Sequence, residues 1–126
     1  MISYIDTCVA RWLVDGDIGK LTLGAKEHIE KTDLLISPMV FLELQYLYEV
    51  KKVAQPAQDA YMYLHKTIGL SICQFPFHTV IACAAEESWT RDPFDRMIVS
   101  HAKANGGAPL ITSDETIRTN YKQAIW

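Results

Sequence analysis

The sequence lacks the features that mark several common classes of protein. It has three cysteines, Cys8, Cys73 and Cys83, and no CxxC pair. An odd number with this spacing argues against a disulfide framework and a zinc knuckle, and it favours a reducing, cytoplasmic environment. The chain does not open on a basic region followed by an apolar stretch, and no apolar run reaches the roughly 18 residues of a membrane span. We therefore expect neither a signal peptide nor a membrane contact.

Positive charge and glycine-rich phosphate loops are also scarce. Twelve Lys and Arg oppose fifteen Asp and Glu, which gives a net charge of −3, so the chain cannot hold a nucleic acid by charge alone. It contains no dinucleotide-binding or P-loop glycine pattern, no Gly-x-Ser-x-Gly elbow and no zinc spacing among its four histidines. Apolar residues are plentiful at 49%. We expect a single domain, residues 1–126, with one core.

Short apolar runs alternate with helical segments throughout the chain. Strands are expected at residues 2–5, 34–36, 70–73 and 109–112, with a final edge strand at 124–126. Helices are expected at 7–14, 26–31, 37–52, 56–67, 78–89, from 92 to the glycines at 106–107, and just after 114. This alternation predicts an α/β fold, a mostly parallel sheet of four to five strands with helices on both faces.

Four acidic residues fall where this fold brings strand ends and helix starts together: Asp6, Glu43, Asp95 and Asp114. Asp6 and Asp114 follow predicted strands, and sites in such sheets gather beyond the carboxyl ends of the strands. Glu43 interrupts an apolar helix face, where a charge needs a cation, a proton or a strong donor. Two carboxylates about 4 Å apart repel by roughly 1–4 kcal/mol in a solvated site. The pattern therefore predicts a divalent cation.

Each acid also has an ordinary structural interpretation. Asp6 and Asp114 are suitable helix caps, and Asp92, Pro93 and Asp95 form an acidic helix start of the usual kind. Glu43 could reach water from the edge of its helix. These separate interpretations do not predict the order of the segments, which is a strand with Asp, a Ser-Pro helix with Glu, Asp-Pro-Phe-Asp-Arg, and a strand with Thr-Ser-Asp.

That order resembles the PIN-domain ribonucleases, in particular the VapC-type toxins of toxin–antitoxin pairs. The matching segments span nearly the whole chain in family order, and they are residues 4–7, 36–44, 91–98 and 110–114. The run Arg-Asp-Pro-Phe-Asp-Arg is the most specific of them. The resemblance implies an α/β/α sandwich and an endoribonuclease that depends on Mg²⁺ or Mn²⁺.

The resemblance also implies the site residues and the partners. Asp6, Glu43, Asp95 and Asp114 would be the catalytic and metal-binding residues, supported by Thr112, Asp92 and Arg96. Thr112 could orient Asp114 or a water molecule, and Arg96 could contact phosphate or pair with a site carboxylate. The expected partners are an RNA substrate, a second copy of the chain and a cognate antitoxin. The antitoxin would cover the helices near Glu43, where the candidate contact residues are Tyr46, Tyr48, Tyr61 and Tyr63.

Two other functions remain open from the sequence. The chain could keep the fold and the carboxylates yet bind metal or RNA without turnover. It could also be a receiver-like phosphoacceptor at Asp6, although Cys8 stands where such a protein needs a second acid. Neither the number of metal ions nor the RNA cleaved can be inferred from these residues.

Overall fold

The computed structural model describes residues 1–126 and contains one five-stranded parallel sheet in the order β3-β2-β1-β4-β5. The strands are β1 Ile2–Ile5, β2 Asp33–Ile36, β3 Ser71–Ile72, β4 Leu110–Ile111 and β5 Ala124–Ile125. The helices are α1 Thr7–Asp15, the 3-10 helix η1 Ile18–Lys20, α2 Leu23–Lys31, α3 Pro38–Glu49, α4 Ala57–Ile68, α5 Phe77–Ala84, α6 Pro93–Ala104 and α7 Glu115–Asn120. The predicted α/β fold with a parallel sheet is confirmed.

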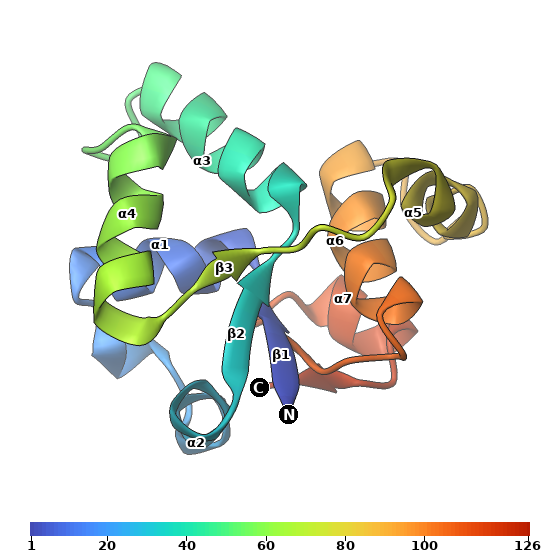
Figure 1. Ribbon diagram of the computed structural model, residues 1–126, viewed down its shortest axis with the longest axis horizontal. Coiled ribbons are helices and arrows are strands. Elements are labelled where there is room, and N and C mark those ends of the chain that lie inside the picture. The colour runs from blue at the N-terminus through green and yellow to red at the C-terminus, as the bar shows by residue number, and fades with distance from the viewer.

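The helices flank the sheet in two groups (Figure 1). Helices α1, α3 and α4 pack against one another, and α5 packs against α6. Helix α3 also contacts α6, so the two groups meet at that point. No helix of the chain combines the length and the apolar character that crossing a membrane requires.

Local sequence signals explain where the two site-bearing helices begin. The Ser37 hydroxyl accepts a hydrogen bond from the Met39 backbone N–H at 3.0 Å, and Pro38 occupies the first turn of α3. Asp92 plays the same part for α6, where Oδ1 accepts from the Phe94 N–H at 2.8 Å. A proline in the first turn removes an N–H that would lack a helical partner. Both helix starts agree with the prediction.

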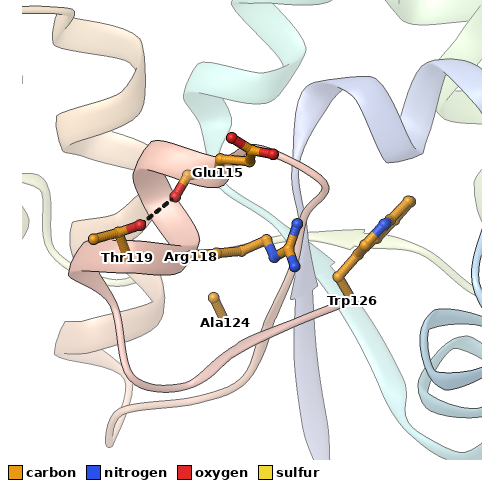
Figure 2. Close-up of a pocket in the computed structure, with 5 residues that line it drawn as sticks. All are labelled: Glu115, Arg118, Thr119, Ala124 and Trp126. Atoms are coloured by element: carbon orange, nitrogen blue, oxygen red, sulfur yellow. Dashed lines mark hydrogen bonds between the residues drawn. The ribbon is translucent and has the colours of Figure 1, made fainter.

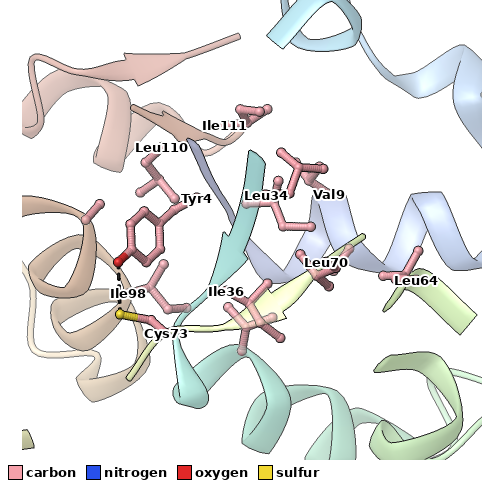
Figure 3. Close-up of a cluster of buried hydrophobic side chains, with 14 of the residues drawn as sticks. Tyr4, Val9, Leu34, Ile36, Leu64, Leu70, Cys73, Ile98, Leu110 and Ile111 are labelled. Atoms are coloured by element: carbon pink, nitrogen blue, oxygen red, sulfur yellow. Dashed lines mark hydrogen bonds between the residues drawn. The ribbon is translucent and has the colours of Figure 1, made fainter. Parts of the chain in front are cut away.

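The core lies around β1, the central strand of the sheet (Figure 3). Tyr4 and Ile5 are fully buried there with Leu110 and Ile111 of β4. The Tyr4 hydroxyl donates to Cys73 Sγ at 2.9 Å and accepts from Asn105 Nδ2 at 2.9 Å. This polar link is buried but satisfied, so it joins β1 to the segments on either side without an unpaired group.

Two predicted helices end earlier than expected. The helix expected to reach residue 52 stops at Glu49, and Lys51 takes a left-handed conformation with φ 64°. The helix expected at 78–89 stops at Ala84. The Glu87 side chain, only 4% exposed, accepts from Trp89 Nε1 and from Lys103 Nζ, both at 2.6 Å. These contacts favour a loop over a further helical turn, and the loop leads directly into Asp92.

Two smaller differences concern the first third of the chain. Helix α2 begins at Leu23, earlier than the expected residue 26, because the Thr22 hydroxyl accepts from the Ala25 N–H at 3.1 Å and caps it. The 3-10 helix η1 was not predicted, since three residues carry too little periodicity to reveal it.

Candidate active site

The four acids come from four different elements that meet near the carboxyl edge of the sheet. Asp6 follows β1 and Asp114 lies just beyond β4, the neighbouring parallel strand. Glu43 lies on the second turn of α3, and Asp95 lies in the first turn of α6. Because α3 contacts α6 and the two strands run side by side, the fold places all four acids on one side of the molecule.

Asp6 is the most buried of these acids, with 7% of its surface exposed. Its Oδ1 accepts from the Thr7 backbone N–H at 2.7 Å, and its Oδ2 accepts from the Thr112 hydroxyl at 2.6 Å. Thr112 is fully buried directly after β4, and its hydroxyl also accepts from the Asp114 N–H at 3.1 Å. One hydroxyl therefore connects the two acids that follow β1 and β4.

Glu43 joins the same network through Thr7. The Thr7 hydroxyl donates to Glu43 Oε1 at 2.5 Å, and the backbone N–H of the same threonine donates to Asp6. A continuous chain of hydrogen bonds thus runs from Glu43 through Asp6 and Thr112 to Asp114. No role for Thr7 was predicted from the sequence, although this residue directly follows Asp6 and lies in the matching segment 4–7.

Asp95 differs from the other acids because no group in the chain donates a hydrogen bond to its carboxylate. Burial raises its pKa to about 7, and the charges of four other acids contribute to the same rise, in decreasing order Asp92, Asp6, Asp114 and Glu43. A carboxyl group with this pKa is close to half-protonated at neutral pH. The charges of four neighbouring acids therefore act on a carboxyl group that has no hydrogen-bond donor to offset them.

The same repulsion reaches Asp6 and Glu43. Burial is the main cause of the raised pKa of both carboxyls, and the charge of Asp92 adds to each. Hydrogen bonds oppose the rise, from Thr112 and Thr7 for Asp6 and from Thr7 for Glu43. The pKa of the Cys8 thiol is also raised, by burial first and then by Asp6 and Glu43, so this cysteine is kept as a poorly reactive thiol.

The supporting residues have distinct positions. Asp92 caps α6 with its carboxylate and so takes the structural part proposed for it, while its charge also acts on Asp95. Arg96 donates to the backbone carbonyls of Thr90 at 2.8 Å and Ala84 at 3.4 Å. The ion pairs of the chain involve Lys20 and Lys103, so Arg96 pairs with no carboxylate. Its contact with phosphate stays a prediction.

The donor chemistry of the four acids fits a hard divalent cation. All the available ligand atoms are carboxylate oxygens, which Mg²⁺ and Mn²⁺ prefer. Burial, and then the charges of neighbouring acids, raise the pKa of Asp6, Glu43 and Asp95, and a cation would relieve the repulsion. In the metal-free protein, no three His, Cys, Asp or Glu side chains lie close enough together to coordinate a metal ion. The hydrogen bonds to Asp6 and Glu43 hold these side chains in the arrangement described above.

The strand order separates the chain from receiver-like proteins, which have the order 2-1-3-4-5. Here β1 lies at the centre, between β2 and β4. Both oxygens of Asp6 also accept hydrogen bonds, and its side chain is buried. The phosphoacceptor interpretation therefore has little structural support.

Comparison with known families agrees with this arrangement. The family described as "PIN domain" matches residues 3–122. The chain therefore belongs to the PIN domain family. A comparison with curated proteins found no match.

Two solved structures share the fold. One is VapBC2 from Rickettsia felis bound to a DNA fragment from their promoter, with 20% identity, a TM-score of 0.68, and coverage of 94% of this chain and 92% of that chain. The other is VapBC-1 from nontypeable Haemophilus influenzae, with 15% identity, a TM-score of 0.61, and coverage of 98% and 96%. At these identities the likeness is one of fold.

Proposed function

We propose that the protein is a metal-dependent endoribonuclease and the toxin of a toxin–antitoxin pair. The observation that carries the proposal is the gathering of acids around Asp95, where burial, together with the charges of four neighbouring carboxylates, raises the pKa to about 7. A structural role alone gives no reason for a fold to gather repelling acids, since each leaves the folded state less stable at neutral pH. Membership of the PIN domain family and the likeness to two VapBC structures support the same conclusion.

Each acid has a distinct part in this proposal. Asp6, Asp95 and Asp114 would hold Mg²⁺ or Mn²⁺, with Glu43 as a further ligand or as a neighbour that acts through Thr7. When bound, such a cation offsets the negative charge of a phosphate and makes nearby water more acidic. Thr112 holds Asp6 in one orientation by donating to Oδ2. The pKa of about 7 belongs to Asp95 in the metal-free protein, and a bound cation would lower it and keep this carboxylate ionised as a ligand.

The test is cleavage of labelled single-stranded RNA in the presence of Mn²⁺. The wild-type chain should cut it, and Asp6→Asn and Asp95→Asn should each reduce the rate by at least about 100-fold, in the range of a lost acid–base or metal function. Asp33→Asn is the matched control, because Asp33 is exposed and opens β2 at the opposite edge of the sheet. The Asp33→Asn protein should cut RNA at the wild-type rate.

The results of this cleavage assay distinguish an enzyme from a binding module. Equal cleavage by wild type and Asp6→Asn would assign the activity to a contaminant. If no variant cuts RNA but the chain binds it, and if Asp6→Asn binds as well or better, the protein is a binding module that keeps the PIN fold. Asn removes one negative charge from the surface that meets the phosphates, so an RNA binder gains from it.

An exposed apolar surface on α3 suits the proposed antitoxin. Leu42 is 52% exposed and Tyr46 is 53% exposed, and both lie within one turn of Glu43. An amphipathic helix could cover these side chains and place a basic residue beside the acids. Leu42→Asp should prevent neutralisation by the antitoxin without loss of cleavage. Ile18 is similarly exposed but lies on η1, so Ile18→Asp should still be neutralised by the antitoxin.

We also propose that the protein is a homodimer, which analytical ultracentrifugation would test.

A further inference from the structure

A hollow with a volume of about 550 Å³ lies between α7 and β5 (Figure 2). The residues that line it are Glu115, Arg118, Thr119, Ala124 and Trp126. Its volume falls within the range of about 300–1,000 Å³ that ligand sites occupy. None of the four acids lines it, so it is separate from the site described above.

The hollow nevertheless lies directly beside that site. The Thr112 N–H donates to the Ile125 carbonyl at 3.0 Å, and Trp126 directly follows β5. On the other side, Glu115 follows Asp114, and the Arg118 N–H donates to the Asp114 carbonyl at 3.0 Å. The threonine that orients Asp6 and the backbone of Asp114 are therefore bonded to the two walls of the hollow.

Arg118 provides the positive charge of the hollow. Its side chain is exposed and forms neither of the two ion pairs of the chain, so its guanidinium is free to meet an anion. Figure 2 shows it extending from α7 toward the side on which Trp126 lies. A planar guanidinium matches the geometry of a phosphate group. The Thr119 hydroxyl donates to the Glu115 carbonyl at 2.8 Å, which leaves its lone pairs available as acceptors.

Trp126 provides an aromatic surface at the other end of the hollow. Its side chain is half-buried, and its ring lies 5.9 Å from the ring of Trp12 at an interplanar angle of 45°. This contact with α1 holds the indole in place before any ligand arrives. A fixed indole beside a free arginine combines the two elements that single-stranded nucleic acids require, a stacking surface for a base and a cation for the backbone.

We propose that the hollow between α7 and β5 is a subsite for one unpaired nucleotide of the RNA, next to the bond that is cleaved. Trp126 stacks on the base and Arg118 contacts a phosphate. This inference rests on the proposed function and deepens it, because it places one nucleotide of the substrate against two named side chains. A base can reach the indole only when it is not stacked in a duplex, so the nucleotide held there is unpaired.

The experiment measures binding in a chain that does not cleave. The Asp6→Asn protein is titrated with a fluorescein-labelled single-stranded RNA of about eight nucleotides, a length that one small domain can contact. Arg118→Ala should weaken binding about 2- to 10-fold at low salt and lower the salt slope by about 0.7, since one phosphate contact is lost. Trp126→Ala should weaken it about 5- to 100-fold, the range for loss of one stacked base.

Three controls give the result its specificity. Lys66→Ala removes one exposed positive charge at the end of α4, just before the amino end of β3, and should bind as the Asp6→Asn parent does. Trp126→Phe keeps an aromatic ring and should restore most of the affinity. In a series of RNAs with one abasic nucleotide each, a single position should make the parent and Trp126→Ala bind equally.

The possible failures are distinguishable. If Arg118→Ala and Trp126→Ala both bind RNA as tightly as the parent while wild type still cleaves, the subsite is wrong, the nuclease stands, and the hollow is left to a protein partner. If Arg118→Ala and Trp126→Ala weaken the binding of duplex RNA by the same factors, the proposal that the nucleotide is unpaired is wrong. If the parent binds no RNA, the subsite and the proposed function both fail. Arg118 is exposed, so its substitution tests the subsite even where Trp126→Ala unfolds the chain.

Discussion

At the scale of single residues, Thr112 and Thr7 decide how the acids of the site are held. The Thr112 hydroxyl donates a hydrogen bond to Asp6 and accepts one from the Asp114 N–H. The Thr7 hydroxyl donates to Glu43, and the Thr7 backbone N–H donates to Asp6. Their hydrogen bonds lower the pKa values that burial and repulsion raise. The site therefore combines acids that repel one another with donors that offset part of that repulsion.

Replacing Thr112 should show how much this donor stabilises the fold. Thr112→Val keeps the shape but removes the hydroxyl that donates to Asp6 and accepts from the Asp114 N–H. The free energy of unfolding should fall by about 1.5–3 kcal/mol, the range for a lost hydrogen bond to a charged group. Urea denaturation at neutral pH in EDTA measures it. Thr112→Ser should recover most of the loss, and equal stability of Val and wild type would contradict the expectation.

Asp95 should make the stability of the metal-free protein depend on pH. Its pKa is about 7 in the folded chain and 3.8 ordinarily. Between these values the folded chain holds a proton that the unfolded chain has released, so the contribution of Asp95 to the free energy of unfolding is greatest below pH 3.8 and falls as the pH rises towards 7. The free energy of unfolding should fall by about 1–2 kcal/mol across this window, because solvent screens part of the effect on the half-buried Asp95. Urea midpoints across this window should vary less in Asp95→Asn than in wild type; an equal variation would argue against the repelling group.

At the scale of elements, the capped helix starts and the loop before α6 position the site. Ser37 and Asp92 fix where α3 and α6 begin, and therefore where Glu43 and Asp95 lie. Ser37 is also linked to α6, since its hydroxyl lies 2.8 Å from His101 Nδ1. Burial lowers the pKa of His101, so the imidazole is neutral in this link at physiological pH.

Two substitutions of Asp92 should separate its cap from its charge. Asp92→Ala removes the acceptor for the Phe94 N–H and should lower the free energy of unfolding by about 0.5–2 kcal/mol. Asp92→Asn keeps an acceptor and removes a charge that repels Asp95, so its free energy of unfolding should fall by less than that of Asp92→Ala. NMR titration of the Asp95 carboxyl should show a lower pKa in both variants. An unchanged Asp95 pKa would mean that the two acids do not interact.

At the scale of the whole molecule, the parallel sheet brings the acids together. All strands run in one direction, with β1 between β2 and β4, so the ends of β1 and β4 meet at one edge. Helices α3 and α6 approach that edge from the two helix groups (Figure 1). A net charge of −3 accompanies this gathering of acids, so a cation that binds there should stabilise the folded state.

Addition of Mn²⁺ should raise the melting temperature. At about ten times the dissociation constant, a ligand that binds only the folded chain adds about 1.4 kcal/mol. This corresponds to several degrees for a domain of this size. A thermal melt with and without Mn²⁺ measures the shift, which should vanish in Asp6→Asn and persist in Asp33→Asn. The absence of a shift in wild type at millimolar Mn²⁺ would remove the physical basis of the metal site.

The sequence by itself determined the features that depend on neighbouring residues. Ser37 with Pro38 and Asp92 with Pro93 start helices through contacts two residues away, and these starts were predicted correctly. The runs that form β1 and β2 were predicted from their local composition, because a short apolar stretch is typical of a buried strand. The alternation of strands and helices was sufficient for the fold class, because a parallel sheet needs helices to connect its strands.

Only the tertiary structure decided the features that depend on distant residues. The end of α5 follows from the bond between Glu87 and Lys103, the orientation of Asp6 from Thr112, and the hollow beside β5 from the contact of Trp126 with Trp12. Thr112 and Asp6 are separated by 106 positions. No local pattern encodes such a pairing, because the energy that selects it exists only once the sheet has brought the two strands together.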